Sequence, residues 1–249
     1  MENPEIIVIG SGIGGLCCAG LLAKEGKKVL VLEAHSKPGG AAHGFSKNGY
    51  KFESGPSLWS GVGTWPTTNP LGQILKALNQ KVELIKYQDW NVQIPEGDFT
   101  IGVGDQRFID QIDLISGKEA IKEWKKFTQV IKPIGEAANA IPLLAINQNK
   151  ETIFQLLKRS KSLFKYLNSF KYLGGAFGNL VDDHLKDPFL RNWVDLLCFL
   201  ISGLTKDETN AAAMATLFND WFKPDAYLEY PKGGSESIVN ALLNGIYSF

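Results

Sequence analysis

Apolar and polar positions near the N-terminus follow the pattern of a strand, a helix and a second strand. Residues 5–9 and 28–32 are short runs rich in β-branched and leucine side chains, which is typical of fully buried strands. Between them, small and apolar residues recur at helical spacing from Gly15 to Lys24, and Gly26 supplies a helix-ending signal. A strand, a helix and a strand within about 30 residues predict a parallel βαβ unit.

The pattern changes after residue 36. Residues 36–70 are rich in Gly, Pro, Ser and Asn, so we expect mostly loop there, followed by a short helix over 71–78. Alternation within 82–115 predicts an antiparallel hairpin that turns at Pro95–Asp98. Beyond this region helical periodicity dominates. We expect helices near 118–132, 151–172, 187–202, 208–222 and 235–245.

Composition narrows the class of protein. The chain has 249 residues, of which 44% are apolar, and this is enough material for a core and excludes intrinsic disorder. One domain or two would fit, since domains usually have about 100–200 residues. The 26 basic and 26 acidic side chains balance, which argues against nucleic-acid binding. Three cysteines make neither a disulfide framework nor a zinc site, so we expect a reducing environment and no metal.

Residues 10–15 carry the most informative motif. Their sequence is G-x-G-x-x-G, and it follows a predicted strand and opens a predicted helix. In this motif the first glycine allows a tight turn, the second lets the backbone approach a pyrophosphate, and the last lets the helix pack closely on the strand. The alternative is a strand–turn–helix with chance glycines, which the βαβ context disfavours. The cofactor contacts expected here are Gly10, Gly12, Ile13, Gly14 and Gly15.

Glu33 ends the second predicted strand. A carboxylate at this position accepts hydrogen bonds from the ribose of an adenine dinucleotide, and it disfavours NADP because it would repel the 2′-phosphate. The sequence therefore predicts an adenine dinucleotide. These residues alone leave the choice between FAD and NAD open.

Three further segments resemble motifs of a flavoprotein group. They are Pro38-Gly39-Gly40, the stretch 50–57 and the stretch 230–234. They resemble the second glycine pair, the F-[DE]-x-G-P-S segment and the P-x-G-G segment of phytoene desaturases, carotenoid isomerases and retinol saturases, within the amine-oxidase-like FAD superfamily. The resemblance spans nearly the whole chain and implies FAD as the cofactor. It also implies that Gly39 and Gly40 let backbone amides approach the flavin side.

The resemblance implies an α/β fold, with a Rossmann-like FAD-binding βαβ domain and a second, mixed α+β, mostly helical substrate domain. Residues 1–72 would form the first part of the FAD-binding domain, 73–228 the substrate or cap domain, and 229–249 the return to the FAD-binding domain. Ala41 stands where many relatives have arginine, so a cationic cofactor contact would be missing or supplied from elsewhere. No strand follows the last predicted helix, so we expect a C-terminal truncation and a missing C-terminal half.

The function implied by resemblance is that of an FAD-dependent oxidoreductase or a redox-neutral isomerase. Its substrate would be a carotenoid or a related long polyene, changed by desaturation, saturation or cis–trans isomerisation. Two alternatives stay open. One is an amine-oxidase-like flavoenzyme with a polar substrate, and the other is an inactive fragment that needs a C-terminal partner chain.

Two weaker signals concern catalysis and membranes. His43 lies in the glycine-rich loop and is a candidate catalytic residue, although a loop histidine without a carboxylate partner is more often structural. Residues 152–177 contain no acid and combine an apolar face with a basic one, which suits contact with an anionic membrane surface or, alternatively, a solvated lysine face. The sequence shows no export signal and no run long enough to span a membrane. We expect an intracellular protein, cytoplasmic or plastid, with peripheral membrane contact.

Overall fold

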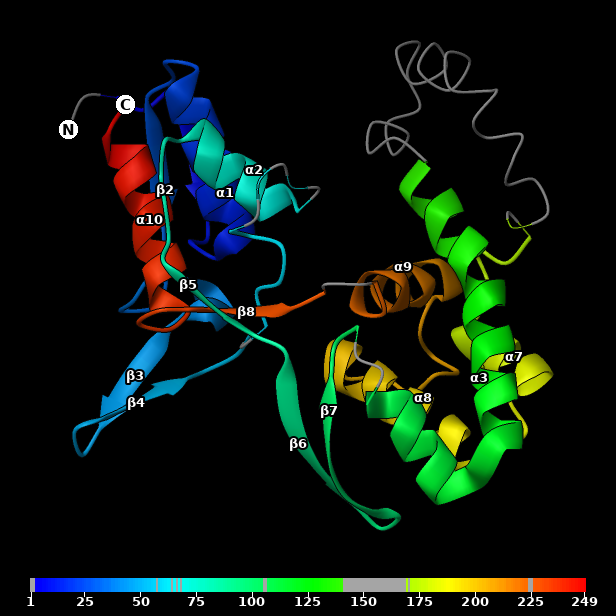
Figure 1. The fold of residues 1–249 in the computed structure, drawn as a ribbon. Helices are drawn as coiled ribbons and strands as arrows, with labels where there is room; N and C mark the ends of the chain where they lie inside the picture. Colours follow the sequence, from blue (N-terminus) through cyan, green and yellow to red (C-terminus); the bar gives the residue numbers. More distant parts are fainter. Residues whose placement is uncertain are drawn as a thin grey trace. The chain divides into compact units, whose positions relative to one another are not determined.

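The computed structural model describes residues 3–56, 58–63, 65, 67, 69–104, 107–140, 169, 171–223 and 226–249. The chain divides into two compact units (Figure 1). Unit 1 comprises Met1–Gln88 and Tyr227–Phe249, and unit 2 comprises Asp89–Ala226. Residues 73–88, which the sequence places in the substrate domain, thus lie in unit 1. They do so because a strand within them pairs with a strand near residue 230.

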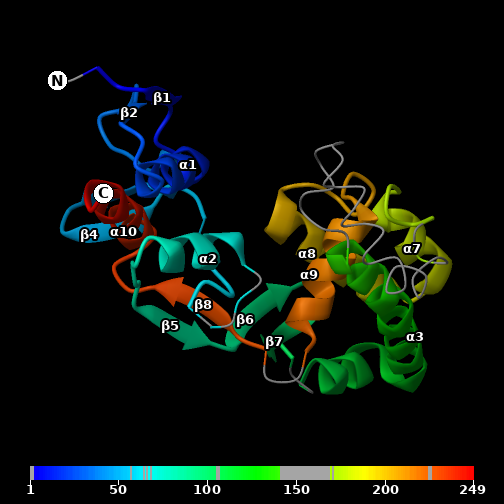
Figure 2. The same cartoon turned by 90° about the horizontal axis from the view of Figure 1, so that it is seen from above.

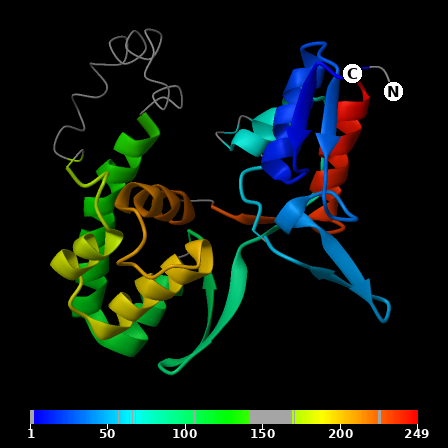
Figure 3. The ribbon, with the colours of Figure 1, turned by 180° about the vertical axis from the view of Figure 1, so that it is seen from behind.

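Unit 1 contains the predicted βαβ arrangement. Strand β1 (Ile6–Ile9) pairs in parallel with β2 (Val29–Leu32), and helix α1 (Ile13–Lys24) connects them. The C-terminal helix α10 (Glu236–Tyr247) packs against α1, and both helices lie beside the two strands in Figures 1 and 3. The prediction of a Rossmann-like α/β unit is confirmed.

The prediction that these strands are fully buried is wrong. Ile7 is 56% exposed and Ile9 is 87% exposed, while Ile6 and Val8, which alternate with them, are half-buried. On β2 the register places Leu30 opposite Ile7, on the same face. Parallel sheets usually have both faces covered. The described residues leave one face of β1 and β2 open.

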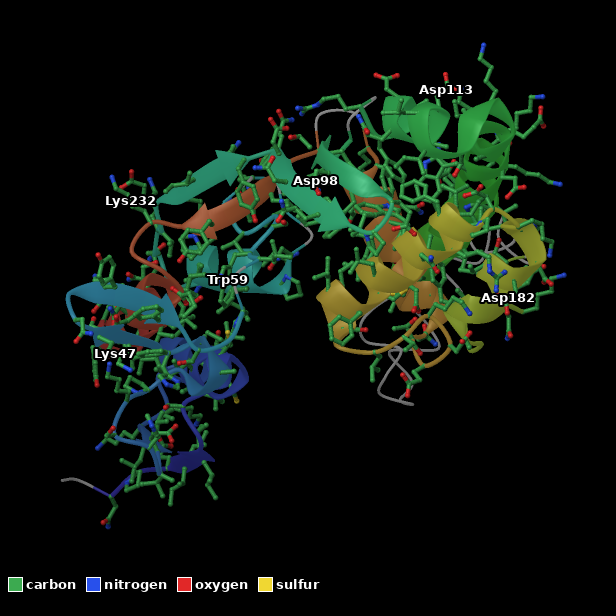
Figure 4. The ribbon with its side chains drawn as sticks, turned by 90° about the horizontal axis from the view of Figure 1, so that it is seen from below. Lys47, Trp59, Asp98, Asp113, Asp182 and Lys232 are labelled. Carbon is green, nitrogen blue, oxygen red and sulfur yellow. The ribbon has the colours of Figure 1, made fainter. Side chains whose placement is uncertain are left out.

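A hairpin lies within residues 36–70, where the sequence predicted mostly loop. Strands β3 (Gly44–Lys47) and β4 (Tyr50–Glu53) pair antiparallel, with Lys47 opposite Tyr50; Figure 4 labels Lys47. Asn48 and Gly49 have φ angles of 54° and 82°, as a two-residue hairpin turn of the primed type requires. The Asn-Gly dipeptide was the signal for this turn. The high polar content of the surrounding residues obscured it.

The remaining elements of unit 1 close its core. Helix α2 (Pro70–Ala77) begins where the Asn69 side chain accepts hydrogen bonds from two backbone amides. Strand β5 (Leu84–Tyr87) pairs antiparallel with β8 (Leu228–Pro231), which joins the two parts of the unit. The predicted helices near 71–78 and 235–245 are confirmed. The core contains Leu16, Trp59, Val62, Leu75, Leu78, Ile238, Val239 and Leu242.

Unit 2 begins with the predicted hairpin and continues into a long helix (Figure 2). Strands β6 (Asp89–Ile94) and β7 (Gly97–Gly102) pair antiparallel around Pro95 and Glu96, so the hairpin and its turn are confirmed. Its expected extent is wrong, because residues 107–115 belong to helix α3 (Arg107–Ala140). Gly117, with φ of 77°, interrupts this helix.

Three shorter helices complete the described part of unit 2. They are α7 (Phe177–His184), which sequence periodicity missed, α8 (Pro188–Ser202) and α9 (Ala211–Trp221), both of which were predicted. Asp182 on α7, labelled in Figure 4, forms ion pairs with Arg191 and Lys206 at 2.6 and 3.5 Å. The aromatic core contains Phe99, Phe108, Trp124, Phe127, Phe177, Phe189, Trp193 and Phe218.

Two expectations fall wholly or largely outside the described residues. One is the predicted helix near 151–172. The other is the predicted membrane-contact segment, residues 152–177, most of which the structure does not describe. Among the residues that the structure describes, no helix is both long and apolar enough to cross a membrane.

Candidate dinucleotide-binding site

The glycine-rich loop of residues 10–15, called the phosphate loop below after its predicted ligand, joins β1 to α1. Gly10 has φ of 92°, and its N–H donates to the Leu32 carbonyl at 2.7 Å, which fixes the loop at the carboxyl ends of both strands. A Cβ added to Gly10, Gly12 or Gly14 would meet nothing within 4 Å, whereas one added to Gly15 would lie 2.1 Å from the Gly10 carbonyl oxygen. The last glycine therefore allows close packing, and the others leave open space above the loop.

The start of α1 is suited to an anion. Its N-cap residue, Gly12, makes no side-chain capping bond, and the first turn carries no acid. The amide groups of a first helical turn have no partners within the helix, and together with the helix dipole they attract phosphate. Gly14 is exposed and Ile13 is half-buried against the core, so the turn presents backbone to the open side. The loop fits a dinucleotide pyrophosphate.

Glu33 lies next to this loop, at the end of β2. Its Oε2 accepts hydrogen bonds from the Ser11 backbone N–H at 2.8 Å and from the Ser11 hydroxyl, and its Oε1 accepts from the His35 N–H at 2.8 Å. The Ser11 hydroxyl, followed by the His35 and Ser11 backbone amides, lowers the pKa of Glu33 to about 2. The side chain is therefore an ionised acceptor at neutral pH, as a ribose contact requires.

A cavity adjoins the carboxylate. Its volume is about 420 Å³, within the usual range of about 300–1,000 Å³ for small-molecule sites. Ser11, Glu33 and the loop residues His35 and Ser36 provide polar groups at its wall, and apolar side chains of α1, β2 and α10 provide much of the remainder. An adenosine would meet both a charged acceptor and an apolar surface here.

The second glycine pair lies directly against the phosphate loop. Gly39 has φ of 115°, and its N–H donates to the Ser11 carbonyl at 2.8 Å. Gly40 has φ of 59°, and a Cβ there would lie 3.0 Å from the Cα of Gly12. The structure therefore brings together the two glycine segments that the sequence separates. Any side chain at Gly40 would push them apart.

Ala41 follows this pair and is exposed. A Cβ at Gly55 would lie 2.4 Å from the Ala41 carbonyl oxygen, so the loop also packs against Gly55. Ala41 itself offers no charge. Whether another part of the protein supplies the cationic contact that many relatives have here stays a prediction.

Glu53 has a role that sequence reasoning missed. Its carboxylate accepts from the Ser235 N–H at 3.0 and 3.2 Å and from the Tyr230 hydroxyl at 3.2 Å. The Ser235 hydroxyl accepts from the Trp59 indole at 3.0 Å and donates to the Pro56 carbonyl at 2.7 Å; Figure 4 labels Trp59. These bonds tie the F-E-x-G-P-S and P-x-G-G segments together. Their separation by about 180 positions gave no local signal.

His43, the catalytic candidate, makes structural contacts. Its Nδ1 lies 2.7 Å from the Gly40 carbonyl oxygen, and its Nε2 lies 3.0 Å from the Ser54 hydroxyl. The His35 ring is 5.0 Å away, between ring centroids. The structure places His43 at the glycine pair but does not test a catalytic role.

Comparisons with known proteins agree with this geometry. The family described as NAD(P)-binding Rossmann-like domain matches residues 8–76. A chloroplastic prolycopene isomerase of an Oncidium hybrid cultivar is 28% identical over 98% of this chain and 41% of its own length. The zebrafish (Danio rerio) all-trans-retinol 13,14-reductase is 30% identical over 96% of this chain and 39% of its own.

A solved oxidoreductase from Methanosarcina mazei has a TM-score of 0.65 at 21% identity, covering 98% of this chain and 49% of its own. The chain therefore has the same fold as the matched part of this solved structure. The resemblance to carotenoid isomerases and retinol reductases, expected from the motifs, is confirmed. The chain spans about 40% of the length of the curated relatives it matches.

Proposed function

We propose that this chain binds FAD and takes part in the desaturation, saturation or isomerisation of a long polyene. The observation that carries the proposal is the joint arrangement of the open glycine loop at α1, the ionised Glu33 and the second glycine pair. These are the groups that a dinucleotide needs: backbone amides for phosphate, a carboxylate for ribose, and close backbone approach.

The choice of FAD over NAD rests on similarity. The segments 38–40, 50–57 and 230–234 resemble motifs of a flavoprotein group, and the relatives named as a prolycopene isomerase and an all-trans-retinol 13,14-reductase support that resemblance. Bound FAD would supply the electron-transfer chemistry that side chains lack. The chain's own residues would hold phosphate at Gly12, hold ribose at Glu33 and bring backbone to the cofactor at Gly39 and Gly40.

The substrate class also comes from the relatives. Prolycopene and retinol are both conjugated polyenes, so the shared chemistry is a long apolar chain of alternating double bonds.

A product assay tests the proposal. The FAD-loaded chain is incubated with prolycopene or all-trans-retinol in lipid vesicles, with a reductant for the retinol arm, and products are separated by liquid chromatography. Gly12→Val is the diagnostic variant. Gly12 has φ −63° and ψ 169°, which any residue can adopt, and nothing lies within 4 Å of an added Cβ, so a side chain can begin there and valine would occupy the space that a pyrophosphate approaches.

We expect conversion of one polyene by the unmodified chain and by Asp98→Asn, an exposed change on the unit 2 hairpin that Figure 4 labels. Gly12→Val should convert neither. A flavin-loaded chain that leaves both polyenes unchanged, or that oxidises an amine such as putrescine instead, would contradict the proposal.

A further inference from the structure

The His43 ring has a hydrogen-bond partner at each nitrogen. A carbonyl oxygen can only accept, so the 2.7 Å contact with Gly40 requires the proton on Nδ1. In the neutral ring Nε2 is then an acceptor, and the Ser54 hydroxyl donates to it across 3.0 Å. One tautomer satisfies both contacts.

These two contacts join different parts of the cofactor site. On one side, Ser54 follows β4, and its N–H also donates to the His43 carbonyl at 3.2 Å. The neighbouring Glu53 is anchored to the start of α10 through Ser235. On the other side, Gly40 lies against Gly12 of the phosphate loop. His43 is therefore the side chain that connects the anchored end of β4 to the glycine pair.

The glycine pair needs such an anchor. Gly39 and Gly40 both have positive φ angles, and glycine loses more conformational freedom on folding than any other residue. The segment is held by the Gly39 N–H bond to Ser11 at 2.8 Å and by the local bonds of the short helix Gly40–Ala42. The imidazole bonds to Gly40 and Ser54 form a side-chain link between this short helix and the end of β4, beside the backbone bond from the Ser54 N–H to the His43 carbonyl.

We propose that His43 is a positioning residue, which holds the second glycine pair against the phosphate loop and thereby raises the affinity for the dinucleotide. The inference rests on the proposed function for the identity of the ligand. It assigns His43 to cofactor binding rather than to acid–base catalysis. Ser54 acts through His43, and neither side chain needs to touch the reacting atoms.

Three variants separate the contacts. His43→Ala removes both bonds. His43→Asn keeps an N–H donor near the Nδ1 position but is too short to reach Ser54, and Ser54→Ala removes only the outer bond. His184→Asn, at the end of α7 in unit 2, is the matched control for loss of an imidazole. FAD dissociation constants are measured by equilibrium dialysis, and unfolding temperatures of the FAD-free chains are measured in parallel.

We expect His43→Ala to weaken FAD binding on the order of tenfold, the scale of one net hydrogen bond of about 1.5 kcal/mol. His43→Asn and Ser54→Ala each lose only the Ser54 bond, so each should weaken FAD binding about threefold, and the unfolding temperatures should change little. Unchanged affinity in His43→Ala would overturn the proposal. Equal losses in His43→Ala and His43→Asn, accompanied by a matching fall in unfolding temperature, would also overturn it, because they would show a merely structural role.

A readout without FAD separates this inference from the proposed function. Amide hydrogen exchange at residues 40–42 of the FAD-free chain should be faster in His43→Ala and intermediate in His43→Asn, which keeps the Gly40 bond alone. If the unmodified chain binds no FAD, the proposed function fails, and the exchange data still decide whether His43 holds the loop. Equal exchange in all variants would refute the positioning role by itself.

Discussion

Replacement of Gly15 by alanine should weaken unit 1 and its cofactor site together. An alanine Cβ would lie 2.1 Å from the Gly10 carbonyl oxygen and 3.2 Å from its carbonyl carbon. Both atoms belong to backbone that β2 holds through the Gly10–Leu32 hydrogen bond, so no flexible side chain can give way. Helix α1 would have to move by more than 1 Å, since ordinary carbon contacts are about 3.5–4.0 Å.

Overpacking of this kind typically costs about 1–3 kcal/mol, and a backbone neighbour favours the upper end. For a domain of roughly 100 residues, about 3 kcal/mol lowers the unfolding temperature by at least about 10 °C. The assay is thermal unfolding followed by circular dichroism, with FAD binding measured on the same samples. We expect the Gly15→Ala chain to unfold earlier and to bind FAD more weakly.

Gly14→Ala is the control in the same helical turn. Nothing lies within 4 Å of an added Cβ there, and alanine favours the helix by up to about 1 kcal/mol. This variant should be as stable as the unmodified chain or more so. Equal stability of Gly15→Ala and Gly14→Ala would refute the reasoning, because it would show that α1 is not held against the loop.

The remaining predictions concern Glu33 and the thiols. Glu33→Gln should lower the stability of the folded chain at pH 7. The pKa of Glu33 is about 2 in the folded chain against 4.5 ordinarily, so the ionised side chain contributes stability that is present above pH 4.5 and lost as the pH falls toward 2. The urea unfolding midpoints of the two chains should therefore converge by about pH 2, and a difference independent of pH would contradict this. Burial raises the pKa of Cys17 and Cys198 to about 11, whereas Cys18 is exposed. At pH 8 a thiol reagent should therefore label Cys18 alone in the native chain and all three after unfolding, and rapid native labelling of Cys198 would disprove its burial.

Local signals predicted much of unit 1. The βαβ unit, its parallel pairing and the glycine loop follow from residues that lie within one supersecondary motif. In unit 2, the hairpin at residues 89–102 and helix α8 follow from alternation and from helical periodicity, and the structure shows that Asp187 caps α8. In each case the residues that specify the structure are neighbours in the chain.

The long-range contacts that complete the site could not be predicted from neighbouring residues in the sequence. Strand β5 pairs with β8 across more than 140 positions, and Glu53 binds Ser235 across about 180. Short strands such as Leu228–Pro231 have too few residues for a period-2 pattern. The open face of β1 was unpredictable for a different reason, since a β-branched run shows that a strand favours burial but not what covers it.

The tautomer of His43 could also not be assigned from the sequence. Sequence placed His43 in a glycine-rich loop, where catalytic and structural roles look alike. Only the paired distances to Gly40 and Ser54 show which nitrogen carries the proton. The same distances support the proposed positioning role of His43.

Equilibrium dialysis of the 249-residue chain against FAD, NAD⁺ and NADP⁺ tests the central claim most directly. The account predicts one FAD bound per chain, competition by ADP, and loss of binding in Gly12→Val with the circular dichroism spectrum unchanged. It also predicts that NADP⁺ binds least, because the ionised Glu33 repels a 2′-phosphate. A folded chain that binds no FAD, or one that prefers NADP⁺, would contradict it.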